Sequence, residues 1–332
     1  MQTTRIPGTD LRVSRIALGT WAIGGWMWGG TDERRSIETI HAAIDRGVTL
    51  VDTAPVYGFG TSEAIVGKAL AEHDAADGVH LSTKVGLEWD DNGGVFRNAS
   101  RDRIQREIDD SLKRLGRERI DVYHVHWPDP TRPIEETANA MRRLVDQDLV
   151  AAVGVSNFTP DQMDRFRDHC PIHVCQPPYN IFERGIESAV KPYCERNPIA
   201  LMTYGALCRG LLTGKMTADA TFEGDDLRNN DPKFAEPRYS QYLRAAERLE
   251  SYANERYGRS LIDFSVRWLL EMGVPIAIWG GRKPEQMEPI DGMFDWTLDG
   301  AALSAVDSIL AEAVEHPVGP DFMAPPTGLG QG

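Results

Sequence analysis

Eight short apolar segments, each followed by a stretch of helical periodicity, constrain the fold of this chain more than any other sequence feature. The apolar segments span residues 16–18, 48–52, 79–84, 120–126, 150–155, 173–176, 199–204 and 275–279. Strands that are buried on both faces of a parallel sheet are nearly continuous apolar runs, so this alternation predicts a parallel sheet covered by helices. Eight such strands in about 280 residues favour a closed (β/α)8 TIM barrel over a doubly wound sheet.

The segments between the apolar runs carry capping residues and helical spacing. Asp32 and Ser100 are placed as N-caps, and Gly47 ends the helix that Asp32 begins. Helices are further expected at 62–72, 101–115, 134–147, 160–169, 186–196, 241–257 and 260–272, with a short helix from Pro284.

Three segments fall outside the alternation, and residues 1–332 are expected to form one barrel domain. A β-hairpin turned at Gly8-Thr9-Asp10 precedes the first barrel strand, and a long polar insertion, 205–240, follows the seventh strand. The tail, 315–332, is rich in proline and glycine. It either covers the barrel mouth or is disordered, and Phe322 and Met323 favour partial order because they offer apolar surface to bury.

Charge and composition argue against several classes of function. The formal net charge of −14 disfavours an electrostatic grip on nucleic acid or anionic lipid. No apolar run of about 18 residues and no signal-peptide core occur, so a soluble cytoplasmic protein is expected. The 4 cysteines form no CxxC pair and are expected to be free thiols. The sequence does not indicate the oligomeric state.

Polar residues occur at the carboxyl ends of the predicted strands, where a barrel of this type carries its active site. Asp52 ends the second strand and Tyr57 follows it, while Lys84 ends the third strand and His124 or His126 the fourth. Asp52 taken alone is most often a cap or turn residue. Lys84 is harder to explain in this way, because a buried lysine needs a partner, and Asp52 on the neighbouring strand is the obvious one.

These four positions together indicate acid–base chemistry. Tyrosine has an ordinary pKa of about 10, so it is a weak proton donor or acceptor at neutral pH without help. We expect Lys84 to lower the pKa of Tyr57, Asp52 to hold Lys84 charged, and the histidine to donate a hydrogen bond to a substrate carbonyl oxygen. Because no redox centre is present in the side chains, a cofactor must supply the electrons.

Other strand tips offer groups that suit a nicotinamide dinucleotide. Tyr204 provides a flat face for stacking, and Ser156, Asn157 and Gln176 provide hydrogen bonds suited to a carboxamide. The eighth strand leads into Arg282 and Lys283, where barrels commonly hold phosphate. No GxGxxG fingerprint or P-loop is present to bind a nucleotide in another way.

Several ordered motifs resemble the aldo-keto reductase superfamily over roughly residues 5–312, most closely its bacterial branch of inositol-operon and general-stress reductases and glycerol dehydrogenase-like members. The motifs are Gly19-Thr20-Trp21, Asp52-Thr-Ala-Pro-Val-Tyr57-Gly, Ser82-Thr-Lys84, His126-Trp-Pro-Asp, Gly154-Val-Ser-Asn-Phe158, Gln176-Pro-Pro-Tyr-Asn180, Gly210-Leu-Leu-Thr-Gly-Lys215 and Trp279-Gly-Gly-Arg-Lys-Pro-Glu-Gln286. The resemblance implies an NADP(H)-dependent oxidoreductase that acts on a small aldehyde or ketone, or on the corresponding alcohol or polyol.

The resemblance also implies residue roles. Tyr57 is the general acid in reduction, Lys84 its neighbour, Asp52 the partner of the lysine, and His126, which directly precedes Trp-Pro, the group that orients the carbonyl. Arg282 is expected to take the 2′-phosphate. The full cofactor-binding set is Thr20, Trp21, Ser156, Asn157, Gln176, Tyr204, Gly205, Leu207, Arg209, Lys215, Gly280, Gly281, Arg282, Lys283 and Gln286. Gly205 and Ile290 depart from the common pattern, which has serine near the pyrophosphate and asparagine near the adenine.

Two other readings of the sequence remain open. His124-Val-His126 resembles the HxH pair of metal-dependent barrel hydrolases, although those sites need further ligands on later strands. A redox-sensing regulatory module of the same fold would bind the cofactor without needing turnover. The substrate pocket is expected to be shaped by Trp26, Trp28, Trp89 and Trp127, together with the loop 220–238 and the tail near Phe322. For each tryptophan, loop packing is an equal alternative. No metal site is expected.

Overall fold

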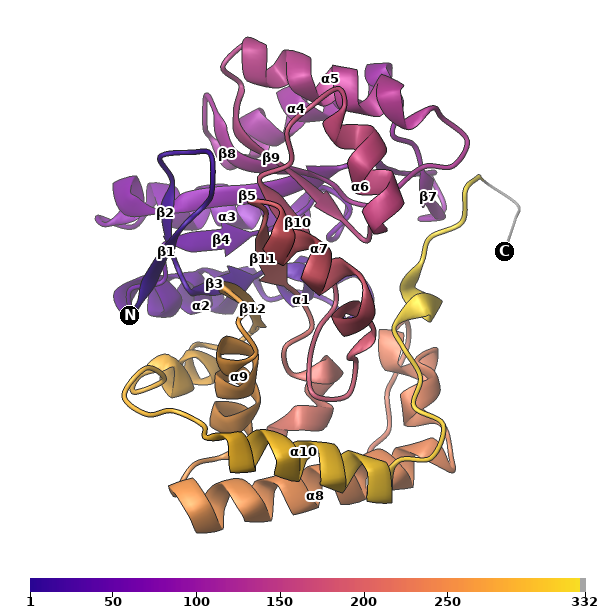
Figure 1. Cartoon of the computed structure of the whole chain (residues 1–332). Helices are drawn as coiled ribbons and strands as arrows, with labels where there is room; N and C mark the ends of the chain where they lie inside the picture. Colours follow the sequence, from indigo (N-terminus) through magenta and orange to yellow (C-terminus); the bar gives the residue numbers. More distant parts are fainter. Residues whose placement is uncertain (329–332) are drawn as a thin grey trace.

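The structure is a computed structural model that describes residues 1–328, and its centre is a closed barrel of parallel strands (Figure 1). Around the barrel the strand order is β10-β11-β12-β3-β4-β5-β8-β9. The strands are β3 (Ile16–Gly19), β4 (Leu50–Asp52), β5 (His80–Val85), β8 (Ile120–Val125), β9 (Val150–Ser156), β10 (Val174–Gln176), β11 (Ala200–Thr203) and β12 (Ile276–Gly280). The predicted (β/α)8 barrel is confirmed, and each strand overlaps one of the predicted apolar segments.

Helices cover the outside of the barrel and follow the strands in the predicted order. They are α2 (Glu33–Asp45), α3 (Thr61–Ala71), α4 (Arg101–Leu115), α5 (Ile134–Asp146), α6 (Pro160–Arg167), α7 (Val190–Arg196), α8 (Arg238–Tyr257) and α9 (Leu261–Glu271). Helix α4 shows why the sequence folds this way. The Ser100 hydroxyl caps it by accepting from the Arg103 amide at 3.3 Å, Ile104 and Ile108 are buried, and Gly116 ends it with φ of +64°. No helix within residues 1–328 is long and apolar enough to cross a membrane.

Small apolar side chains fill the inside of the barrel, and the N-terminal hairpin closes its far end. Val122, Ala152, Val174 and Met202 belong to this inner cluster. Strands β1 (Thr3–Arg5) and β2 (Arg12–Ser14) pair antiparallel, and Ile6 in the hairpin loop is fully buried against the cluster. The predicted hairpin is therefore confirmed. Because this end is sealed, a ligand must enter from the carboxyl ends of the strands.

Three elements were not expected from the sequence. A second hairpin, β6 (Leu87–Trp89) and β7 (Val95–Arg97), lies between β5 and α4, and its turn is held by Asp90, whose carboxylate accepts from the amides of Asn92 and Gly94. Helix α10 (Gly300–Ala313) is capped by Asp299 and packs beside α8 (Figure 1). The Gly/Trp-rich loop that follows β3 contains the one-turn helix α1 (Trp21–Gly24).

The insertion and the tail both lie at the mouth of the barrel. The insertion contains the 3-10 turns η3 (Cys208–Thr213), η4 (Leu227–Asn229) and η5 (Pro232–Phe234). From α10 the tail runs toward β7, with the turn η7 (Asp321–Met323) on its way (Figure 1). The Arg97 amide donates to the carbonyl of Pro326 at 2.9 Å, and the Arg97 Nε donates to that of Pro325 at 2.8 Å. The described part of the tail thus lies against β7 and lines the cleft at the mouth, whereas 329–332 lie outside the described residues.

Candidate active site

A cleft of about 1190 Å³ opens at the carboxyl ends of the barrel strands. The barrel strands, the insertion and the tail all contribute to its lining. Asp52, Tyr57 and His126 line it, whereas Lys84 is fully buried beneath them. The lining also includes every residue that the sequence placed in the cofactor-binding set: Thr20, Trp21, Ser156, Asn157, Gln176, Tyr204, Gly205, Leu207, Arg209, Lys215, Gly280, Gly281, Arg282, Lys283 and Gln286.

A buried ion pair forms the floor of the cleft. Lys84 Nζ donates to Asp52 Oδ2 at 2.6 Å and to the carbonyl of Thr53 at 2.8 Å. The other carboxylate oxygen, Asp52 Oδ1, accepts from Ser82 Oγ at 2.7 Å and from Gln176 Nε2 at 2.9 Å. Strand register explains the arrangement, because Asp52 pairs with Ser82 across β4 and β5, and Lys84 lies two residues further along β5 on the same face. Every oxygen of Asp52 is therefore satisfied.

Tyr57 lies directly above this pair and between two other rings. The ammonium of Lys84 is 4.9 Å from the centre of the Tyr57 ring, and the His126 ring meets it edge-on with centroids 5.8 Å apart. Trp21 stacks on it, also at 5.8 Å. No residue among 1–328 hydrogen-bonds the Tyr57 hydroxyl, which leaves it able to donate to a ligand in the cleft.

The pKa directions differ from the sequence prediction for Tyr57. Burial, followed by the negative charge of Asp52, raises the pKa of Tyr57 well above its ordinary value, and Lys84 does not reverse this. The physical reason is that the phenol is buried, and desolvation disfavours the charged phenolate. Burial also lowers the pKa of Lys84, with Asp52 opposing it. Tyr57 is therefore a protonated phenol, which suits an acid.

Both histidines at the end of the fourth barrel strand, His124 in β8 and His126 directly after it, have lowered pKa values and are neutral near pH 7. Burial, then the Lys84 charge and His124, lowers the pKa of His126 well below its ordinary value. Its backbone carbonyl accepts from Asn157 Nδ2 at 3.0 Å. His124 is inside the barrel with a pKa of about 3, chiefly because of burial, and its two ring nitrogens have no partner among residues 1–328. A side chain at Gly154 would collide with it, since an added Cβ would be 2.1 Å from His124 Nδ1.

The side chains expected to hydrogen-bond a carboxamide form a hydrogen-bond network with one another. Tyr204 donates from its hydroxyl to Asn157 Oδ1 at 2.9 Å, and Asn157 Nδ2 also donates to Ser156 Oγ at 3.0 Å. Ser156 in turn donates to the carbonyl of Gln176 at 2.8 Å. Asn157 adopts a left-handed backbone, with φ of +62°, which directs its amide toward His126. This network fixes the wall beside Tyr57.

Cations gather at the other end of the cleft. Arg282 Nη1 donates to the carbonyl of Trp28 at 2.5 Å and Nη2 to that of Gly30 at 2.8 Å. Gln286 Oε1 accepts from the amides of Arg282 and Lys283, at 2.7 and 3.0 Å, and so holds this loop. Within residues 1–328 the ammonium groups of Lys283 and Lys215 form no ion pair closer than 4.0 Å, although the charge of Lys283 acts on Glu285. This donor set fits the phosphates of a dinucleotide.

Arg209 differs from the other cations because it is neutralised by two carboxylates. Its guanidinium contacts Glu183 and donates from Nε to Asp231 at 2.6 Å. Lys233, fully buried, pairs with the same Glu183 at 2.7 Å and donates to the carbonyl of Gly319 in the tail at 3.2 Å. Two cations thus balance two carboxylates. Arg209 lines the cleft, but its main contacts tie the insertion, the loop before α7 and the tail together.

The loop 220–238 and the tail near Phe322 were expected to shape the pocket, and both line the cleft. The loop contributes Leu227, Arg228 and Asn230, and the tail contributes Phe322, Met323, Ala324, Pro325 and Pro326, whereas Met216 was not expected. The Arg228 guanidinium pairs with Asp226 at 2.6 Å and lies over the Phe222 ring at 4.1 Å. Irregular loops carry no periodicity, so the sequence indicated the loop and the tail as segments but, apart from Phe322 and Met323, not their individual residues. Of the four predicted pocket tryptophans, Trp26, Trp28 and Trp127 line the cleft and Trp89 does not.

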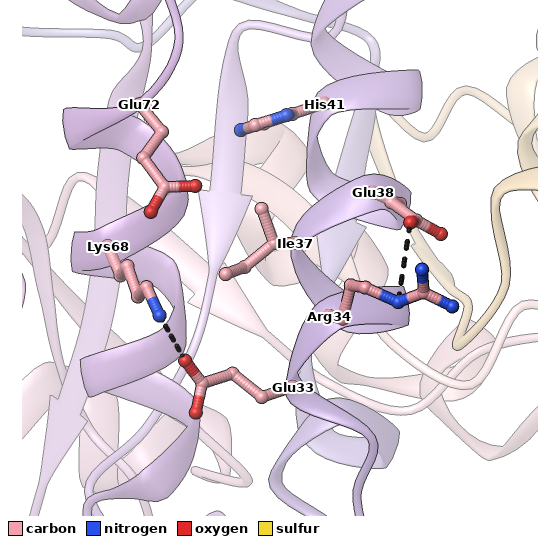
Figure 2. A pocket seen from close by; sticks show the side chains of 7 residues that line it. All are labelled: Glu33, Arg34, Ile37, Glu38, His41, Lys68 and Glu72. Atoms are coloured by element: carbon pink, nitrogen blue, oxygen red, sulfur yellow. Dashed lines mark hydrogen bonds and ion pairs between the residues drawn. The ribbon is translucent and has the colours of Figure 1, made fainter.

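A smaller hollow between α2 and α3 is no alternative site (Figure 2). Four of its charged side chains form two ion pairs, Lys68 with Glu33 at 2.5 Å and Arg34 with Glu38 at 3.9 Å. Nor do residues 1–328 contain a group of three or more His, Cys, Asp or Glu side chains placed to hold a metal ion. The hydrolase reading of His124 and His126 therefore has no geometry to support it.

The barrel, its sealed lower end and the Asp-Tyr-Lys-His constellation define a class of oxidoreductase. Residues 15–311 match the Aldo/keto reductase family model, and the chain belongs to this family. The aldo-keto reductase YhdN of Bacillus subtilis (strain 168) is 55% identical over 328 residues, which cover 98% of this chain and 99% of that one.

Two further relatives illustrate the range of the family. The NADH-specific methylglyoxal reductase of Escherichia coli (strain K12) is 33% identical, with 93% of this chain and 98% of the relative covered. Among solved structures, the glycerol dehydrogenase AKR11B4 from Gluconobacter oxydans superposes with a TM-score of 0.88 at 51% identity, covering 97% of this chain and 99% of that one. Aldo-keto reductases use nicotinamide cofactors, and they act on small carbonyl compounds or alcohols.

Proposed function

We propose that this protein transfers a hydride between NADP(H) and a small aldehyde or ketone, or in reverse from the corresponding alcohol or polyol. The observation that carries the proposal is the arrangement of Tyr57 over the buried Lys84–Asp52 pair, with His126 at its edge and its own hydroxyl open to the cleft. The nicotinamide group, when bound, supplies the hydride.

The side chains of this chain supply binding and proton transfer. Tyr57 donates its hydroxyl proton to the carbonyl oxygen in reduction and accepts it back in alcohol oxidation. The neutral imidazole of His126 donates a hydrogen bond to the same oxygen and holds the carbonyl in place. Lys84 stays charged through Asp52 and stabilises the phenolate that forms once the proton has left. In the free protein the raised pKa of Tyr57 keeps this proton in place.

The preference for NADP(H) rests on the cations at the far end of the cleft. Arg282 and Lys283 adjoin one another after β12, and Arg282 can turn from the two carbonyls it now holds to a 2′-phosphate. At the Tyr57 end, the buried indole N–H of Trp21 has no hydrogen-bond partner among residues 1–328 and offers the cofactor a further donor. The names of relatives differ in the nicotinamide cofactor that they state. One carries "NADH-specific" in its name, and another, 28% identical, is the aldo-keto reductase yakc [NADP(+)] of Schizosaccharomyces pombe.

Comparing two arginines tests the cofactor preference. Arg282→Ala is expected to weaken NADPH binding at least tenfold and NADH binding less than threefold, because only NADPH carries the extra phosphate. Arg35→Ala serves as the control, since Arg35 also lines this end but is held by Glu285 at 2.8 and 3.0 Å. If Arg282→Ala weakened the binding of NADPH and NADH equally, Arg282 would only hold the loop that contains Trp28 and Gly30.

A screen of aldehydes, ketones and polyols with both cofactors tests the reaction itself. Reduction of small aldehydes with NADPH is the expected result. A protein that binds NADPH but turns over no carbonyl compound or alcohol would instead be the redox-sensing regulatory module of the same fold.

A further inference from the structure

The loop that presents Tyr57 has a strained backbone. The three residues that directly follow the phenol and its flanking carbonyl, Gly58, Phe59 and Gly60, have positive φ angles of +67°, +55° and +98°. A left-handed conformation costs a bulky residue such as phenylalanine free energy, and it persists only where the surrounding structure holds it in place. The contacts that hold this loop therefore decide where the Tyr57 hydroxyl lies.

Arg114, near the end of α4, supports the loop from outside the barrel. An added Cβ at Gly60 would be 3.0 Å from Arg114 Cδ, so the arginine side chain packs directly against the turn. Helix α4 can come this close because Gly67 in α3 has no side chain, and a Cβ there would be 2.4 Å from the carbonyl oxygen of Arg114. Arg114 does not line the cleft, so any influence that it has on the reaction passes through the loop.

A buried carboxylate connects Arg114 to the strand that carries Lys84. Glu63, in the first turn of α3, is fully buried, and its Oε2 accepts from Arg114 Nε at 2.6 Å. Its Oε1 accepts from the hydroxyl of Thr83 at 2.6 Å, and Thr83 directly precedes Lys84 in β5. Glu63 thus fixes the start of α3, where the Tyr57 loop ends, against the strand of the buried ion pair.

Arg103 offers a comparison within the same charge cluster, which consists of Arg103, Arg114, Glu63 and Glu107. Glu107 is almost fully buried in α4 and accepts from both arginines. Two cations and two carboxylates thus balance each other, as buried charges require. The contacts with Glu63 and Gly60, however, are made by Arg114. The two arginines therefore share one partner and differ in their link to the Tyr57 loop.

We propose that Arg114 is a positioning residue for proton transfer. By holding Glu63 and the turn at Gly60, it sets where the Tyr57 hydroxyl meets the oxygen of a bound carbonyl compound. The inference rests on the proposed function, in which Tyr57 donates the proton. Reacting atoms must lie about 3–3.5 Å apart, and a misplacement of about 1 Å can slow a reaction about a hundredfold. A remote contact that fixes this loop therefore acts on the chemical step rather than on cofactor binding.

Single-turnover reduction of propanal, followed by stopped-flow loss of NADPH absorbance, tests this role. The rate constant reports the chemical step and the amplitude reports the folded fraction, so the two effects of a substitution are separated. For Arg114→Met we expect the rate constant to fall about tenfold and the Kd for NADPH to change less than about twofold. Arg114→Lys keeps a charged donor beside Glu63 and should return to within about threefold of wild type. Arg103→Met is the matched control, and its rate constant should stay within about twofold of wild type.

A double variant keeps the test valid if the single variant folds poorly. Arg114→Met leaves the charge of Glu63 buried without its cation, whereas Glu63→Gln/Arg114→Met leaves a neutral amide that can still accept from Thr83. The double variant should therefore be the more stable of the two. We expect the same fall in its rate constant, because the contact with Gly60 is removed in both.

The possible results separate positioning from stability. A lowered amplitude with an unchanged rate constant in both Arg114→Met variants would mean that Arg114 only stabilises the fold. An equal fall of the rate constant in Arg103→Met would assign the effect to the whole charge cluster. Either result overturns the positioning role and leaves the proposed function standing. Failure of the wild type to turn over propanal or other small carbonyl compounds would refute the proposed function and this inference with it.

Discussion

Of the substitutions considered, replacement of Lys84 by methionine is expected to lower the free energy of unfolding the most. Lys84 Nζ is 2.6 Å from Asp52 Oδ2, and both side chains are almost completely removed from solvent. At this distance and an effective dielectric constant of about 20 the attraction is about 6 kcal/mol. Lys84→Met leaves Asp52 with donors only from Ser82 and Gln176, so its charge stays buried and uncompensated. We expect the free energy of unfolding to fall by about 3–5 kcal/mol.

Urea unfolding monitored by tryptophan fluorescence measures this loss, and a double-mutant cycle with Asp52→Asn isolates the pair. The double variant is expected to be more stable than the sum of the two single losses predicts, because it contains no unpaired charge. Turnover is lost in all three variants. A loss below about 1 kcal/mol in Lys84→Met would refute the reasoning, since Asp52 would then not be buried as a charge.

Lys233→Met is the matched control for this experiment. Lys233 is equally buried and pairs with Glu183 at 2.7 Å, but it belongs to the cluster that joins the insertion to the tail. Its replacement should destabilise the protein to a similar extent while kcat with propanal is retained. Loss of kcat in both variants would mean that buried charge in general, rather than Lys84 in particular, supports turnover.

Two further predictions concern His124, which is buried inside the barrel, and Arg97, which hydrogen-bonds the tail. His124 has a pKa of about 3 in the folded protein and about 6.5 when unfolded. Its contribution to the free energy of unfolding is therefore complete above pH 6.5. As the pH falls toward 3, this contribution is lost by about 1.4 kcal/mol per pH unit. Urea unfolding at pH 7, 5.5 and 4.5 should show a smaller acid loss in His124→Asn than in wild type, and equal slopes would contradict this. Arg97→Ala removes the side-chain bond to the tail at Pro325, so cleavage by chymotrypsin near Phe322 should speed up several-fold. Unchanged cleavage rates, read by mass spectrometry, would show that the tail is held without Arg97.

The sequence predicts the barrel well because its periodicity is regular. Apolar runs such as 120–126 and caps such as Ser100 agree with the tertiary structure, so local preference and packing point the same way. The hairpin β6–β7 was missed although Asp90 and the Gly93-Gly94 pair form a turn signal, because its strands are only three residues long. Helix α10 was missed for a different reason: its alanine-rich surface lacks a strong apolar stripe.

The candidate site was predictable where it lies on strands and less so where it lies on loops. Asp52 and Lys84 share one face of adjacent strands, so strand register alone brings them together. The net pKa of Tyr57 in the free protein could not be predicted, because spacing reveals the nearby Lys84 and Asp52 but not the depth of burial, which is the largest cause of the raised pKa. Similarly, Arg209 could not be seen as a paired residue, since Glu183 and Asp231 come from distant segments.

Tyr57→Phe tests the central claim most directly, because it removes one hydroxyl and retains the ring between Trp21 and His126. NADPH binding, followed by quenching of tryptophan fluorescence, and propanal reduction, followed by NADPH absorbance, are measured on the same preparation. We predict a Kd for NADPH within twofold of wild type and a fall in kcat of at least a hundredfold, the scale of general acid catalysis. Turnover close to the wild-type rate would contradict the assignment of Tyr57 as the proton donor.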